Sequence, residues 1–160
     1  MSEAKYKTMR HIETVRNHLN TVIKEFIRVG EAHDQSKMES FEVEAFEKYT
    51  PLLKGLTYGS QEYKDCLTQM KPTIDHHYKA NASHHPEGNE GGIQGMTLLQ
   101  LTEMIVDWKC SGMRHTDGDI YKSIEINQKR FGYSDELKQI FINTAKWLDA
   151  QKTFHKAEES

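Results

Sequence analysis

Apolar residues recur at steps of three and four along most of the chain, the spacing that lines one face of an α-helix. The first such stripe, within residues 8–29, consists of Ile12, Val15, Leu19, Val22, Phe26 and Val29. We find no segment in which apolar and polar residues alternate as they do in a half-buried strand. The pattern therefore predicts an all-α protein.

Helix caps and breakers set the expected boundaries. The predicted helices cover residues 8–29, 36–49, 61–81, 97–114, 120–131 and 134–151. We expect Gly30 to end the first helix, Thr50–Pro51 to end the second, and Pro72 to kink or divide the third. Residues 82–95 hold four glycines and Pro86 and lack an apolar period, so they are predicted to form a loop.

Capping boxes mark two of the predicted helix starts, because Ser36 is followed by Glu39 and Thr97 by Gln100 at the required spacing. Gly132 is expected to end the fifth helix and Ser134 to cap the last one. A turn is expected at residues 116–118, and the polar tail from about residue 151 is expected to fray.

The bulk composition predicts a single domain over residues 1–160, large enough to bury a core. A net charge of -3 gives no indication of a nucleic-acid or membrane partner. Without a signal peptide or a long apolar run, the chain is expected to be cytoplasmic. The oligomeric state stays open, and a homo-oligomer is compatible with the sequence. We interpret Cys66 and Cys110 as buried free thiols.

The histidines indicate a functional site, which the overall composition does not. The chain has nine histidines, and five of them stand in three tight groups: His33 beside Asp34, the pair His76–His77, and the pair His84–His85. Surface residues rarely cluster in this way, so the grouping indicates a site.

The string His33-Asp34-Gln35-Ser36-Lys37 follows the end of a predicted helix. An imidazole and a carboxylate at a chain bend can bind one divalent ion, and a carboxylate can bridge two ions about 3.5–4 Å apart. Lys37 would then face an anionic substrate. The alternative interpretation is an exposed loop with a capping aspartate.

The first helix carries His11 and His18, two turns apart at the edge of its apolar stripe. We interpret His18 as a packing residue and His11 as a candidate ligand. In the predicted helix 97–114, polar residues share one stripe, namely Glu103, Asp107, Cys110 and Arg114. A buried carboxylate there requires a partner, which is either an internal salt bridge to Arg114 or a metal ion bound by Asp107.

His76, His77, His84 and His85 lie close enough in the sequence to reach one site. Imidazole nitrogen together with carboxylate oxygen suits manganese, iron, cobalt, nickel or zinc. Adjacent residues on a helix diverge by about 100°. We therefore expect one histidine of each pair to bind a given ion.

The order of these residues resembles the HD-domain superfamily, whose signature is H…HD…D. The matching positions are His11 with Val15, His33–Asp34 with Lys37, the later histidines, and Val106–Asp107. Longer strings are similar to an uncharacterised family of small bacterial and phage proteins, a domain of unknown function: HIETVRNHL, AHDQSK, DHHY, HHPE, DWK and MRHTDGDIYKSIEINQKRF. For a phage protein, the expected location becomes the host cytoplasm.

The resemblance implies a bundle of five or more helices around one or two metal ions, and hydrolysis of phosphoesters or phosphoanhydrides. The implied core ligands are His11, His33, Asp34 and Asp107, with Asp34 as bridge and His76, His77, His84 and His85 as candidates for a second site. A metal-activated water would attack phosphorus. The expected contacts to a nucleotide or other small phosphoester are Lys37, Arg114, Lys122 and Arg130.

Three other functions remain open at this point. A mixed-valence di-iron oxygenase would use the same ligands and consume oxygen. A catalytically silent module would bind a nucleotide without turnover. A polypeptide partner is favoured only if the metal site proves empty.

Overall fold

The computed structural model describes residues 2–56, 60–113 and 118–151, in two units formed by residues 1–35 and 36–160. Every regular element within the described residues is an α-helix or a 3-10 helix, which confirms the predicted all-α class. None of the helices described there is long and apolar enough to cross a bilayer. The single domain over residues 1–160 stays a prediction.

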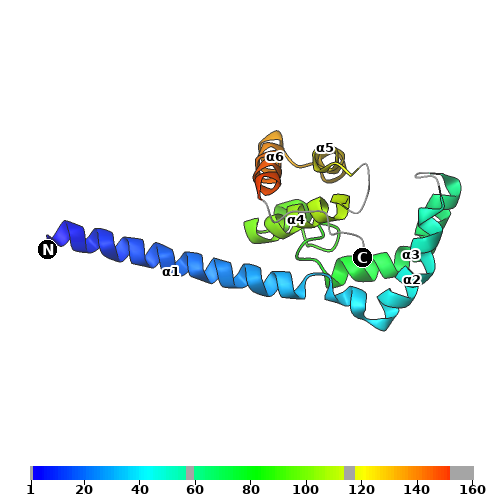
Figure 1. Ribbon diagram of the computed structural model, residues 1–160, viewed down its shortest axis with the longest axis horizontal. Helices are drawn as coiled ribbons and strands as arrows, with labels where there is room; N and C mark the ends of the chain where they lie inside the picture. The colour runs from blue at the N-terminus through cyan, green and yellow to red at the C-terminus, as the bar shows by residue number, and fades with distance from the viewer. Residues whose placement is uncertain (1, 57–59, 114–117, 152–160) are drawn as a thin grey trace. The chain divides into compact units, whose positions relative to one another are not determined.

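The first unit consists of helix α1, Glu3–Ala32, which is continuous along its whole length (Figure 1). Ser2 caps it, because its hydroxyl accepts a hydrogen bond from the backbone N–H of Lys5 at 3.3 Å. The predicted end at Gly30 was wrong. The helix passes through this glycine and ends just before Asp34, whose φ of 57° is left-handed, the conformation that commonly ends a helix.

In the second unit, helix α2, Ser40–Lys54, and helix α3, Gln61–Ala80, pack against each other. The predicted third helix is confirmed, and it continues through Pro72. The predicted stop at Thr50–Pro51 was wrong. Pro51 lies in the last turn of α2, where it removes one hydrogen bond shortly before the helix ends at Lys54.

Helices α4, Leu98–Met113, α5, Ile120–Phe131, and α6, Asp135–Ala150, pack around the main core. The fully buried members of that core include Met104, Ile105, Ile124, Phe141 and Ala145. Apolar side chains from all three helices thus meet at one place, and this packing holds α4 in position.

The predicted caps of these helices are confirmed. The backbone N–H of Gln100 donates to Thr97 Oγ1 at 3.3 Å, and that of Leu137 donates to Ser134 Oγ at 3.3 Å. Gly132 ends α5 with a left-handed φ of 68°. The turn predicted at residues 116–118 falls largely outside the described residues.

One burial prediction was wrong. Cys66 is buried as expected, but Cys110 is exposed. Cys110 is exposed because it belongs to the polar stripe of α4 rather than to the face that packs against α5 and α6.

The segment between α3 and α4 contains turns and a short 3-10 helix, η2, Gly92–Gly95. Gly88 packs directly against the end of α3, because a Cβ atom at this position would lie 1.8 Å from the carbonyl oxygen of Tyr78. Gly91 and Gly92 take positive φ values of 84° and 59°. The close packing of Gly88 and the chain reversal at Gly91 and Gly92 thus fold this loop back against the end of α3.

Asp149 on α6 links the three core helices. Its carboxylate accepts a hydrogen bond from the Tyr121 hydroxyl at 2.7 Å and pairs with the Lys109 ammonium group. Hydrogen bonds from Lys109 and then Tyr121 lower the pKa of Asp149. A lowered pKa contributes stability above the ordinary pKa of about 4, and this contribution disappears as the pH falls through the lowered value.

We therefore expect Asp149→Asn to cost about 0.5–1 kcal/mol at pH 7, the range for partly exposed ion pairs. The deficit should shrink as the pH falls through the lowered pKa of Asp149, because the wild-type carboxylate then also becomes protonated. Urea unfolding of both proteins at pH 7 and at a series of acidic pH values measures it. A deficit that does not change across this series would contradict the prediction.

Candidate metal centre

A turn at the end of α3 brings the two histidine pairs together. Asn81 is the C-cap of α3 and is buried. Its carbonyl oxygen accepts hydrogen bonds from the backbone N–H groups of His84 and His85 at 3.1 and 3.2 Å. The chain therefore reverses directly after the helix and returns His84 and His85 to His77.

These three residues, His77, His84 and His85, form the histidine cluster. Each offers a ring nitrogen, and the three nitrogens all lie within 4.8 Å of one another. The Nε2 atoms of His77 and His85 are 2.9 Å apart. Two nitrogens bound to one cation at about 2.0–2.1 Å are separated by about 2.9 Å when the angle between them is 90°. The spacing thus fits a shared cation as well as it fits an N–H···N hydrogen bond.

A buried carboxylate orients His77. Glu42, on α2, is fully buried and accepts hydrogen bonds from His76 Nδ1 at 2.8 Å and from His77 Nδ1 at 2.9 Å. Burial raises the pKa of Glu42, but hydrogen bonds from His76, Ser36 and His77 together bring this pKa below its ordinary value. An ionised Glu42 accepts the Nδ1 proton of His77, which leaves the Nε2 lone pair to the cluster.

A second carboxylate lies beside His84. Glu103 Oε1, on α4, is 2.9 Å from His84 Nδ1, and both side chains are buried. A negative charge at this distance favours the proton on Nδ1, so that Nε2 keeps its lone pair. Two of the three cluster imidazoles thus have a buried carboxylate at Nδ1.

Ser36 and Asn81 complete the network. The Asn81 side-chain amide donates to Ser36 Oγ at 2.6 Å and to the carbonyl oxygen of His77 at 3.0 Å. The predicted capping box at Ser36–Glu39 was wrong, since these residues lead through a 3-10 helix, Gln35–Met38, and Glu39 is the N-cap of α2. The Ser36 hydroxyl is buried against Asn81 and is therefore used for tertiary contacts.

One residue of the pair His76–His77 belongs to the histidine cluster, whereas both residues of the pair His84–His85 belong to it. His76 binds Glu42, but its side chain is 41% exposed and it does not belong to the cluster, because it diverges from His77 on the helix surface. Both His84 and His85 belong to it, because a turn rather than a helix carries them.

His33 and Asp34, which we call the HD pair, lie at the end of the first unit, where His33 Nε2 is 3.6 Å from Asp34 Oδ2. His11 precedes His33 by 22 residues on a continuous helix, a separation of about 33 Å at 1.5 Å per residue. The first unit by itself does not bring His11 to the HD pair. A ligand set of His11, His33 and Asp34 stays a prediction.

Several of the remaining predicted residues make contacts of their own. Asp107 is half-buried on α4 and accepts a hydrogen bond from Ser111 Oγ at 3.3 Å. Arg114 lies outside the described residues, so its proposed relation to Asp107 is not visible. Lys37 lies over the Phe46 ring at 5.9 Å, Lys122 is exposed on α5, and Arg130 pairs with Glu87.

Sequence analysis missed the role of Glu42, and it placed Glu103 on the polar stripe of its helix without pairing it with His84. Glu42 occupies a position at which an apolar side chain is expected, one turn before Phe46 on the inward face of α2. A carboxylate on an apolar face costs free energy unless it has a partner, and this is the pattern that could have identified Glu42.

Comparison with known proteins gives a family-level result. A model described as a family of unknown function (DUF5662) matches residues 1–153. No curated protein and no solved structure matches the chain. The matched region includes the HD pair, the histidine cluster and both buried glutamates.

Proposed function

We propose that this chain, which belongs to the family of unknown function DUF5662, is a metal-dependent phosphohydrolase that acts on a nucleotide or another small phosphoester. The family gives no activity, so the proposal is argued from the residues of the chain. The observation that carries the proposal is the histidine cluster, in which three ring nitrogens lie within 4.8 Å of one another. Buried polar groups such as these ring nitrogens require hydrogen-bond or metal partners.

The donor set fits a transition metal. Imidazole nitrogens with nearby carboxylates suit manganese, iron, cobalt, nickel or zinc, whether one ion or two are bound. Metal-binding histidines generally direct their other ring nitrogen at a carboxylate or carbonyl, which fixes the ring and its tautomer. Glu42 and Glu103 stand in this position behind His77 and His84.

A bound metal ion would supply the nucleophile by lowering the pKa of a coordinated water. Glu42 and Glu103 keep the Nε2 lone pairs of His77 and His84 available, and burial excludes bulk water from both rings. The proposed phosphate contacts are cations from the sequence pattern, namely Lys37, Arg114 and Lys122. Arg130 was expected among them, but it is paired with Glu87.

The residue order H…HD…D supports an assignment to the HD type. We accordingly propose His33, Asp34 and Asp107 as further ligands, on the sequence pattern alone, and leave out His11 because it lies about 33 Å from His33 along α1. Replacing Asp34 with alanine tests this extension, because loss of bound metal is expected only if Asp34 is a ligand.

The experiment begins with protein stripped of metal by a chelator and reloaded separately with manganese, iron, cobalt, nickel or zinc. We expect phosphate release from a panel of nucleotides, cyclic nucleotides and dinucleoside polyphosphates only after reloading. His77→Ala should reduce this release at least about a hundredfold, in line with loss of a metal ligand. His18→Gln, on α1 and outside the proposed site, serves as the matched control and should retain it.

Two outcomes would contradict the proposal. Iron-dependent oxygen uptake without phosphate release would indicate the oxygenase alternative. Nucleotide binding without turnover, whichever metal is loaded, would indicate a binding module.

A further inference from the structure

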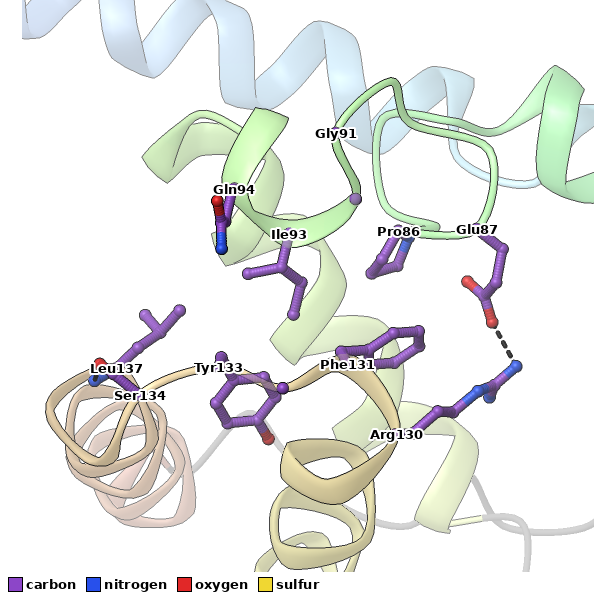
Figure 2. A pocket seen from close by; sticks show the side chains of 12 residues that line it. Pro86, Glu87, Gly91, Ile93, Gln94, Arg130, Phe131, Tyr133, Ser134 and Leu137 are labelled. Carbon is purple, nitrogen blue, oxygen red and sulfur yellow. Dashed lines mark hydrogen bonds and ion pairs between the residues drawn. The ribbon is translucent and has the colours of Figure 1, made fainter.

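A pocket of about 610 Å³ lies between the loop after α3 and the junction of α5 with α6 (Figure 2). Its volume falls within the range of small-molecule sites, about 300–1,000 Å³. The histidine cluster does not use it, although His85 is followed directly by Pro86, which lines the pocket. The pocket and the cluster therefore share one loop.

Two apolar sides face each other across this pocket. Pro86 and Ile93 come from the loop and η2, while Phe131 and Tyr133 come from the α5–α6 junction (Figure 2). Pro86, Ile93 and Tyr133 are buried and Phe131 is half-buried. Opposed apolar and aromatic side chains favour a flat ring, which can stack on an aromatic face.

One end of the pocket is charged. Arg130 forms an ion pair with Glu87, and its guanidinium lies 4.9 Å from the centroid of the Phe131 ring (Figure 2). The carboxylate accepts hydrogen bonds from N–H groups and the guanidinium donates to oxygen or ring nitrogen. An acceptor beside a donor matches the edge of a heteroaromatic ring that carries an amino group.

We propose that this pocket binds the base of a nucleotide, specifically a base with an exocyclic amino group, while the phosphate is directed to the histidine cluster. Apolar sides hold the ring, and Glu87 with Arg130 reads its edge. The inference deepens the proposed function and rests on it for the role of the phosphate. Binding of the base itself does not require a metal.

Trp108 provides a readout of this pocket. Its ring is stacked against Phe131, with centroids 6.2 Å apart and an interplanar angle of 11°. The other tryptophan, Trp147, is 62% exposed, so a Trp147→Phe background leaves Trp108 as the reporter. A base entering beside Phe131 is expected to change the Trp108 fluorescence.

The test uses metal-free protein titrated with adenosine monophosphate and, as a probe without a base, ribose 5-phosphate. We expect adenosine monophosphate to bind at least about tenfold more tightly. Glu87→Gln should weaken its binding about tenfold, because a hydrogen bond to a charged carboxylate is replaced by a weaker one to a neutral amide. Glu90→Gln is the matched control, since Glu90 is exposed on the same loop and does not line the pocket.

Equal binding of the two probes, or equal affinity in the Glu87→Gln and Glu90→Gln variants, would overturn the pocket assignment. Base-dependent binding without phosphate release after metal reloading would support the pocket and overturn the proposed hydrolase activity. The two proposals thus fail in different measurements.

Discussion

Replacing His84 with alanine is expected to reduce bound metal to below about a tenth of the wild-type amount, after dialysis against metal-free buffer. His84 is 1% exposed and belongs to the histidine cluster. Its loss removes a ligand and leaves the buried Glu103 carboxylate without its imidazole neighbour. Leaving a buried polar group without its partner costs about 1–3 kcal/mol, so the melting temperature should also fall.

Metal analysis by mass spectrometry and thermal unfolding, both on the same samples, measure these effects. His76→Ala is the matched control, because His76 also binds a buried carboxylate but lies outside the cluster. His85→Ala tests the same ligand set at a half-buried position where unfolding is less of a concern. Metal retained in both the His84 and His85 variants would refute the cluster as the metal site.

The second large effect is expected for Glu42→Gln. An amide cannot accept hydrogen bonds at both of its terminal atoms, so either His76 or His77 loses its acceptor. Hydrogen bonds to charged groups contribute about 1.5–3 kcal/mol, and we expect a loss of stability in this range. Metal affinity should fall about 10–100-fold, since His77 is no longer held in one tautomer.

Urea unfolding and a competition titration with a chromogenic chelator measure the two quantities. Glu44→Gln is the control, because Glu44 is exposed on the same helix two residues later. Wild-type metal affinity in the Glu42 variant would show that this carboxylate serves only folding.

Much of the helical architecture could be predicted from local pattern. Caps at Thr97, Gly132 and Ser134 were found because the chemistry of a helix end is encoded within a few residues. The errors at Gly30 and Pro51 concern breakers inside helices. A glycine costs about 1 kcal/mol and a proline about 3 kcal/mol, and other interactions along the helix can outweigh such penalties.

The histidines could be predicted as a group and the carboxylates could not. Clustering of His76, His77, His84 and His85 is visible in the sequence, whereas the burial of Glu42 depends on how α2 packs against α3. The choice of His77 over His76 also depends on the direction of α3. Tertiary packing, rather than any local pattern, decides both.

The turn at Asn81 has a consequence for folding. The histidine cluster spans only residues 77–85, so closing it in an unfolded chain costs little loop entropy. Contacts this local form early and do not wait for distant segments to meet. We therefore expect the denatured ensemble also to bind the proposed metal, and binding to both states would cancel part of the stabilisation. Added metal is then expected to raise the unfolding temperature by less than its affinity for the native protein would suggest.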